Sequence, residues 1–148
     1  MIKLLSVELH TLIHKLWILY YIVIFCIRLI WRGIIHDISK FKCNAEAKLL
    51  SENIGKLKYT TYGSKKYFNL LKDIQPFLDH HYTNNRHHPE HYLNGYKEMS
   101  LIDIVEMFLD WKAATKKHNN GDMRISIKTN KERFSLSDDI VEIFTNSI

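Results

Sequence analysis

The amino-acid sequence predicts an all-α fold, a compact helical bundle that forms a single domain over residues 1–148. Apolar residues recur at spacings of three and four, as they do on the buried face of a helix. Serine or asparagine stands where several of these segments begin, as is typical of helix caps. The chain has no repeat, low-complexity stretch or long linker, and its 46% hydrophobic and 25% charged residues are typical of a globular protein with a core.

The first predicted helix runs from Val7 to Arg32, with Ser6 as its cap and Gly33 as its stop. Within it, residues 16–27 are twelve uncharged and strongly apolar residues. A membrane span needs roughly 20 such residues, so the length favours a helix buried inside a bundle. No small-residue cleavage site follows, which disfavours a signal peptide. We therefore expect no membrane partner.

Shorter elements follow this helix. A turn carries His36 and Asp37, and Asn44 is predicted to cap a short helix that ends at Leu50. The polar segment 55–63, with two glycines, is predicted as a loop. Helical spacing returns over residues 67–78, where Pro76 either kinks the helix or begins a new one that runs into the histidine-rich stretch.

The second half of the chain is predicted as two helices separated by irregular structure. The histidine-rich stretch through Tyr96 is predicted as a loop, and Ser100 caps an amphipathic helix that ends near residues 119–122. Residues 124–134 alternate weakly and are predicted as a loop or a brief hairpin. Ser137 then opens the last helix.

Charge and cysteine content suggest partners and a compartment. The net charge of +5 and the pI of about 9.1 indicate an anionic partner, a nucleotide or another phosphate ester. The basic residues are scattered, so the signal for nucleic acid is weak. Cys26 and Cys43 have no CxxC spacing, which favours reduced thiols and a cytoplasmic location.

The histidines carry the most specific signal. Five of the nine fall within residues 80–91, and an earlier His-Asp pair and a later aspartate flank them. Neutral imidazole and carboxylate are common ligands of divalent ions, so we predict one or two ions of manganese, iron, zinc or magnesium. The predicted ligands are His14, His36, Asp37, His81, His87, His88 and Asp110.

Each of these residues also has a structural interpretation. His36 and Asp37 could each cap a helix, and His14, with apolar neighbours, could be a buried and hydrogen-bonded histidine. An acidic stripe of Asp103, Glu106 and Asp110 could be a solvated face. This interpretation suits Asp103, whereas the apolar neighbours of Asp110 require a cation.

Lys40 and Arg86 are predicted to neutralise a phosphoryl group beside the ions, the alternative being ordinary surface charge. His80 or His91 could orient a ligand or face the substrate. Which member of each adjacent histidine pair binds metal stays open.

The order of these residues resembles the H…HD…H…HH…D pattern of the two-metal HD-domain phosphohydrolases, among them cyclic-dinucleotide and cyclic-nucleotide phosphodiesterases. The segment 36–40 (HDISK) resembles their HDxxK turn. More narrowly, the segments 36–41 (HDISKF), 85–91 (NRHHPEH) and 106–113 (EMFLDWKA) are similar to a small uncharacterised family of phage, other viral and bacterial genomes. The resemblance covers residues 14–114. The chain lacks the GYP element and is shorter than most phosphodiesterases, so no particular substrate is carried over.

The resemblance implies an all-helical HD-type fold with its site between helices, and a divalent-metal-dependent hydrolase of nucleotides or other small phosphate esters. One ion would be held by His14, His36, Asp37 and Asp110, and a second by His81 and His87 or His88, with Asp37 bridging. A metal-activated water would attack phosphorus. Lys40 and Arg86 would clamp the phosphoryl oxygens, Glu90 or His91 would protonate the leaving group, and Glu46 and Glu106 would orient ligand imidazoles.

Two other functions use similar ligands. Some HD-domain proteins are mixed-valence di-iron oxygenases, and dense histidines suit iron equally well. A non-catalytic, metal-stabilised nucleotide-binding protein is the other alternative. A structural zinc site is disfavoured, because such sites favour cysteine ligands and both cysteines lie away from the cluster.

Overall fold

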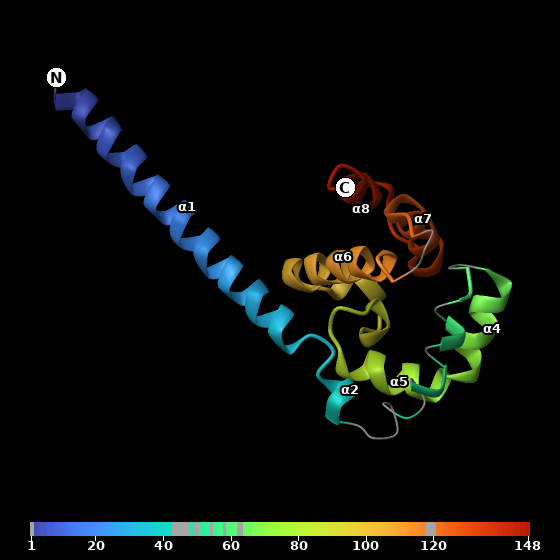
Figure 1. The fold of residues 1–148 in the computed structure, drawn as a ribbon. Coiled ribbons are helices and arrows are strands. Elements are labelled where there is room, and N and C mark those ends of the chain that lie inside the picture. Colours follow the sequence, from blue (N-terminus) through green and yellow to red (C-terminus); the bar gives the residue numbers. More distant parts are fainter. Residues whose placement is uncertain are drawn as a thin grey trace. The chain divides into compact units, whose positions relative to one another are not determined.

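The computed structural model describes residues 2–42, 48, 51–53, 55–57, 59–61, 64–117 and 121–148. The described chain is all-α and contains no strand, which confirms the predicted fold class. Two 3₁₀ helices, η1 and η2, lie between α5 and α6 in the chain, and the α-helices are labelled in Figure 1. In chain order the elements are α1 (Ile2–Ile35), α2 (Ser39–Lys42), α4 (Lys65–Asp73), α5 (Gln75–Asn84), η1 (Pro89–His91), η2 (Gly95–Glu98), α6 (Leu101–Thr115), α7 (Met123–Phe134) and α8 (Asp138–Thr145).

The chain divides into two units, Met1–Ile35 and His36–Ile148. The first unit is helix α1, which extends beyond both of its predicted ends. Ser6 and Gly33 lie inside the helix, so neither acts as the cap or the stop that the sequence predicts. Extra apolar residues on both sides of these positions continue the helical spacing, which explains the longer helix.

The prediction that α1 is buried is wrong. Its large apolar side chains are exposed, with Leu16 57% and Trp17 55% exposed, and His14 is exposed as well. By length and composition alone the helix could cross a membrane, since the apolar stretch has a mean hydropathy of 2.0. A signal sequence near an N-terminus meets the same criterion, so the finding assigns no location.

The second unit begins with the turn at His36 and the short helix α2. Helix α4 begins after Ser64, whose side chain accepts a hydrogen bond from the backbone N–H of Tyr67. Pro76 lies in the first turn of α5, as predicted for a proline that opens a new helix. Ile74, Phe77 and Leu78 form a small core here.

Some predicted features lie outside the described residues. These are Cys43, Asn44, Glu46 and most of the predicted short helix that ends at Leu50. Asn119 and Asn120, part of the predicted end of the helix after Ser100, also lie outside.

Helix α6 begins at a reciprocal cap, as the sequence predicts for Ser100. The Ser100 hydroxyl accepts from the backbone N–H of Asp103, and the Asp103 carboxylate accepts from the backbone N–H of Ser100 at 3.0 Å. The helix packs into the main core of the second unit, which α7 and α8 complete. That core consists of Met99, Met107, Phe108, Trp111, Ile127, Leu136 and Phe144.

The prediction of a loop or hairpin over residues 124–134 is wrong, because α7 spans Met123–Phe134. Asp122 caps it by accepting from the backbone N–H of Arg124. The buried face carries Ser126, Ile127 and Asn130, a helical spacing hidden in the sequence because two of the three residues are polar. Packing against α6 overrides the weak helical propensity of this segment.

Candidate metal centre

The His-Asp turn directs two side chains toward one place. Asp37 has a φ of 55°, in the left-handed region that few residues other than glycine adopt. Aspartate tolerates this conformation better than most residues. The Lys40 backbone N–H donates to the Asp37 carbonyl at 2.9 Å, and the Lys40 ammonium lies 2.5 Å from Asp37 Oδ2. The turn therefore holds the Asp37 carboxylate so that Oδ2 is paired with Lys40 and Oδ1 faces other side chains.

A first group of four donor residues surrounds Asp37 Oδ1. Its members are Asp37, His81, His87 and His88, each offering a ligand atom within 4.8 Å of all the others. Asp37 Oδ1 lies 3.3 Å from His81 Nε2 and 3.5 Å from His87 Nε2. Helix α5 supplies His81, whereas His87 and His88 come from the turn that leads into η1. All four were predicted as ligands.

Two atoms of this group are buried without a hydrogen bond from any described residue, namely Asp37 Oδ1 and His87 Nε2. Buried polar atoms in proteins are nearly always paired, because an unmet acceptor in the interior costs about 1–3 kcal/mol. A cation bound by both atoms would remove this cost. The donor chemistry, one carboxylate oxygen among three imidazoles, fits a transition-metal or zinc ion.

The spacing of His81 and His88 fits the same interpretation. Their Nε2 atoms are 2.9 Å apart. Two nitrogens that each lie about 2.1 Å from one ion are about 3.0 Å apart at a right angle and about 3.4 Å apart at a tetrahedral angle. The two imidazoles thus face each other at the separation of neighbouring ligands.

Asn85 and Ser39 position the far side of the His81 ring. Asn85 Nδ2 donates to Ser39 Oγ at 2.8 Å and to the His81 carbonyl at 2.7 Å, which uses both amide hydrogens. His81 Nδ1 lies 3.0 Å from Asn85 Nδ2 and 3.4 Å from Ser39 Oγ. When this nitrogen carries the proton and donates to Ser39, Nε2 keeps its lone pair for an ion.

A second group of donors is formed by His36, His87 and Asp110. His36 Nε2 lies 3.6 Å from Asp110 Oδ1 and 3.4 Å from Asp37 Oδ2. The two groups share His87, whose ring centroid lies 4.4 Å from that of His36. Asp37 therefore has one oxygen near each group, which is the arrangement that a bridging carboxylate requires.

Glu106 connects the two imidazoles of the second group. Its Oε1 lies 2.9 Å from His36 Nδ1 and 3.3 Å from His87 Nδ1. A carboxylate that accepts from the Nδ1–H of a histidine fixes the ring and leaves Nε2 to face a metal. The sequence predicted this role for Glu106, and the carboxylate lies where the role requires it.

Electrostatics differ between the two groups. Hydrogen bonds to Asp110 and Glu106 raise the pKa of His36 to about 10. Burial lowers the pKa of His81 to about 4 and lowers the pKa of His88 well below its ordinary value. Burial acts to raise the pKa of Asp37, but the Lys40 ammonium offsets this and lowers it overall. His81 and His88 are thus neutral imidazoles beside a charged Asp37 carboxylate, and these are the protonation states that bind metal.

Other predicted site residues lie in different surroundings. His14 is exposed on α1, in the first unit, and belongs to neither donor group. The Arg86 side chain is 55% exposed and pairs with Asp103 at 3.2 Å. Glu90 pairs with Arg133 at 2.5 Å. His80 is exposed, and His91 Nδ1 lies 3.3 Å from the Tyr82 carbonyl.

The sequence interpretation placed Asp103 on a solvated face, and the structure corrects this. Its exposed fraction is 0%, and its carboxylate accepts from Arg86, Tyr92 and Ser100. The helix spacing that suggested an acidic stripe is present, but the stripe faces inward. Besides Asp103, the sequence analysis missed Ser39, Asn85 and Arg133, which flank the donors; the first two lie inside the segments HDISKF and NRHHPEH.

The second unit thus defines the class of protein: an all-α protein with histidines and carboxylates gathered into a candidate metal centre. The chain belongs to a family of unknown function (DUF5662), whose sequence profile matches residues 4–148. Comparisons with curated proteins and with solved structures gave no match.

Proposed function

We propose that this protein is a divalent-metal-dependent phosphohydrolase that acts on a nucleotide or another small phosphate ester. The observation that carries the proposal is the pair of donor groups that share His87 and lie on either side of Asp37. Asp37 Oδ1 and His87 Nε2 are buried without a hydrogen bond from any described residue, and this supports a cation at the first group. The resemblance to HD-domain phosphohydrolases supports the reaction class.

Each residue of the centre has a task in this proposal. Asp37 would bridge two ions, with His81, His87 and His88 on one side and His36 with Asp110 on the other. Glu106 would hold the His36 and His87 rings in orientation, and Ser39 would do so for His81. When bound, divalent ions would activate a water molecule and stabilise the charge that develops on the phosphoryl oxygens.

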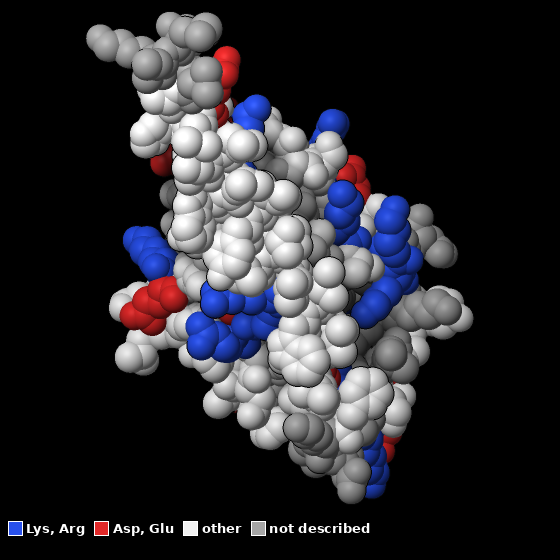
Figure 2. Space-filling model, turned by 90° about the vertical axis from the view of Figure 1, so that its left-hand side faces the viewer, with Lys and Arg blue, Asp and Glu red and all other residues white. Residues whose placement is uncertain are grey.

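The cations beside the centre would contribute to substrate binding. The Lys40 ammonium lies against Asp37 Oδ2, and in this proposal it would contact a phosphoryl oxygen bound beside that carboxylate. Figure 2 shows a face on which lysine and arginine side chains cover more area than acidic ones, in line with the net charge of +5. Such a surface would attract an anionic substrate. Nucleic acid remains a weaker candidate, because the basic residues are scattered along the sequence.

Three predicted residues have no fixed place in the mechanism. His14 is still proposed as a ligand of the ion that His36, Asp37 and Asp110 would hold, and His14→Ala tests this role. Arg86 as a clamp and Glu90 as a proton donor would each have to leave an ion pair, with Asp103 and Arg133 respectively. These pairs favour positioning roles for both residues.

The experiment that tests the function is a screen of nucleotides, cyclic nucleotides and aryl phosphates with protein loaded separately with Mn²⁺, Fe²⁺, Zn²⁺ and Mg²⁺. The expected result is metal-dependent phosphate release that Asp37→Asn abolishes. Asp139→Asn is the matched control, because it makes the same chemical change at an exposed aspartate of α8 that belongs to neither donor group. Equal activity in wild type and Asp37→Asn would contradict the proposal.

A di-iron oxygenase is a second candidate, because three imidazoles around one carboxylate also suit iron. It would need O₂ and iron for turnover, whereas hydrolysis proceeds without O₂. Anaerobic assays of the iron-loaded protein therefore separate the two functions. A non-catalytic metal-stabilised nucleotide-binding protein would bind nucleotide without turnover under either condition.

We propose a cytoplasmic location, in keeping with the cysteine content. The absence of a membrane partner was expected because α1 was predicted to be buried, and the exposure of α1 removes that argument. Fractionation of cells that express the full chain tests the location directly. Recovery in the soluble fraction without detergent is expected, and recovery only with detergent would assign α1 to a bilayer.

A further inference from the structure

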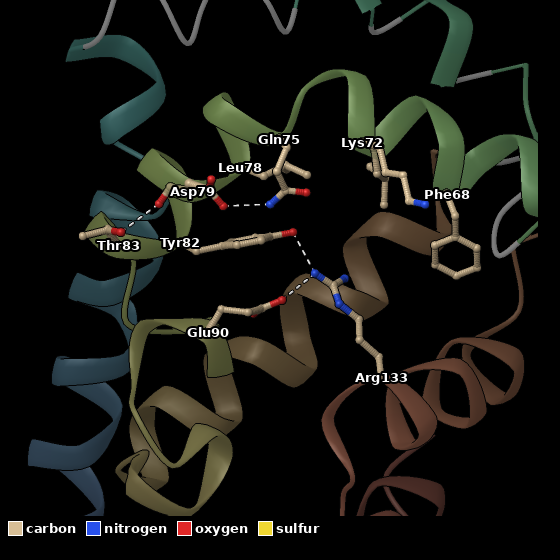
Figure 3. Close-up of a pocket in the computed structure, with 10 residues that line it drawn as sticks. Phe68, Lys72, Gln75, Leu78, Asp79, Tyr82, Thr83, Glu90 and Arg133 are labelled. Atoms are coloured by element: carbon tan, nitrogen blue, oxygen red, sulfur yellow. Dashed lines mark hydrogen bonds and ion pairs between the residues drawn. The ribbon is translucent and has the colours of Figure 1, made fainter.

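Arg133, near the end of α7, reaches into a pocket of about 610 Å³ formed by α4, α5, η1 and α7 (Figure 3). None of the metal donors lines this pocket. Arg133 is hydrogen-bonded to two other lining residues, Tyr82 and Glu90, and Figure 3 shows both of them pointing toward the guanidinium.

One guanidinium nitrogen makes both connections. Arg133 Nη2 donates to the Tyr82 hydroxyl at 2.7 Å and to Glu90 Oε1 at 2.5 Å. The guanidinium also lies over two rings, 5.6 Å from the centroid of Tyr82 and 4.7 Å from that of Phe134. A planar guanidinium can combine an ion pair with ring stacking, which an ammonium cannot reproduce.

Both partners of Arg133 stand next to metal donors in the chain. Tyr82 follows His81 on α5, and Glu90 lies two residues after His88 in η1. The Tyr82 ring also packs against the His88 ring, with centroids 4.8 Å apart. The Arg133 side chain therefore ties helix α5 to the histidine-bearing turn on the side of Tyr82 that faces the pocket.

A metal site tolerates little error in the distances among its ligands, about 0.2 Å for each bond. His81 and His88 come from two different elements, and their 2.9 Å separation depends on how those elements are held together. We propose that Arg133 is a positioning residue of the metal centre, which sets the spacing of the α5 and η1 histidines through Tyr82 and Glu90. This inference rests on the proposed metal centre and adds a residue from α7 to it.

The test is the affinity for Co²⁺ and the visible spectrum of the Co²⁺ complex, measured for wild type, Arg133→Met and Arg133→Lys. The Co²⁺ spectrum reports the coordination geometry, which a purely structural role would leave unchanged. Residues that hold ligands from outside the coordination sphere typically contribute 10-fold to 100-fold in metal affinity. We expect Arg133→Met to bind Co²⁺ about tenfold more weakly with an altered spectrum, and Arg133→Lys to recover only part of the affinity.

Lys131→Met is the matched control, because this cation lies on the same helix and pairs with Asp138, outside the pocket. Tyr82→Phe keeps the ring and removes the hydroxyl, so it is expected to weaken Co²⁺ binding less than Arg133→Met does. Chemical denaturation of each metal-free protein establishes that the variants fold.

The outcomes separate this inference from the proposed function. Wild-type Co²⁺ binding with an unchanged affinity and spectrum in a folded Arg133→Met protein would overturn the positioning role alone. No Co²⁺ binding by wild type would overturn the metal centre and, with it, this inference. A loss of the same size in Lys131→Met would also contradict a specific role for Arg133.

Discussion

Asp37 and His81 are 44 positions apart in the chain, yet Asp37 Oδ1 lies 3.3 Å from His81 Nε2. The left-handed backbone at Asp37 and the hydrogen bond between Asn85 and Ser39 bring the His-Asp turn and helix α5 together. This contact joins the two halves of the candidate metal centre. The predictions below follow from it and from its neighbours.

Asp37→Asn is expected to abolish metal binding. The amide keeps the size of the carboxylate, but it removes the negative charge that both donor groups share and reduces the capacity to bridge. We expect at least a 100-fold loss of Zn²⁺ affinity, because losing a ligand costs more than the 10-fold to 100-fold that is lost when a residue that only orients a ligand is changed. Titration against a competing chelator measures it. An affinity within threefold of wild type would show that Asp37 is no ligand.

Glu106→Gln is expected to weaken metal binding by about 10-fold to 100-fold without removing a ligand. The carboxylate contacts Nδ1 of His36 and of His87, and a neutral amide would hold both rings less firmly. Isothermal titration with Zn²⁺ measures the change. Glu142→Gln on the exposed face of α8 is the control, and an equal loss in this control would rule out a specific effect.

The stability of the metal-free protein is expected to peak near neutral pH. The His36 pKa is raised to about 10, so its stabilising contribution is complete below pH 6.5 and is lost as the pH rises toward 10. The His81 pKa is lowered to about 4, so the unfolded chain binds more protons between pH 4 and 6.5, and stability rises with pH there. Urea denaturation from pH 4 to 10 measures both limbs.

Variants of His36 and His81 test which histidine causes each limb of the stability curve. His36→Asn should flatten the fall in stability above pH 6.5. His81→Asn should reduce the rise below pH 6.5, and the rest of that rise comes from His88, whose pKa is also lowered by burial. An unchanged alkaline limb in His36→Asn would contradict the assignment to this histidine. Metal binding near pH 7 should also release a proton from His36, which calorimetry in buffers of different ionisation enthalpy detects.

Asp103→Asn is expected to destabilise the protein by about 1.5–3 kcal/mol, the usual contribution of hydrogen bonds to a charged group, because a neutral amide replaces the buried carboxylate. The buried carboxylate accepts from Arg86, Tyr92 and Ser100, and these contacts hold its pKa well below the usual range although burial acts to raise it. Arg86→Met should cost less, since more than half of that side chain is exposed. Urea denaturation compares the two, and a larger loss in Arg86→Met would contradict this account.

Much of the centre could be predicted from the sequence, because its ligand types and their order are distinctive. The His-Asp pair, the paired histidines and Asp110 stand in recognisable segments, and the structure brings six of the seven predicted ligands into two groups. Helix α6 was equally readable, since Ser100 and its apolar spacing mark the start and the buried face.

Other features depend on tertiary contacts that spacing does not encode. The helix at residues 123–134 buries Ser126 and Asn130, so its inward face lacked an apolar stripe. Asp103 seemed a surface acid because its partners Arg86 and Tyr92 lie in a separate segment. Arg133 lies far from the metal-donor histidines in sequence and is connected to their elements through Tyr82 and Glu90. The sequence did not reveal the exposure of α1, because an apolar helix is expected to be buried but its composition does not show which surface covers it.

The most direct test of the central claim is the metal content of the full chain purified without a histidine tag, measured by elemental mass spectrometry for wild type and Asp37→Asn. The account predicts one or two equivalents of manganese, iron, zinc or magnesium in wild type and a loss of bound metal in the variant. A wild-type protein that holds no metal, even after reconstitution with each ion, would contradict it.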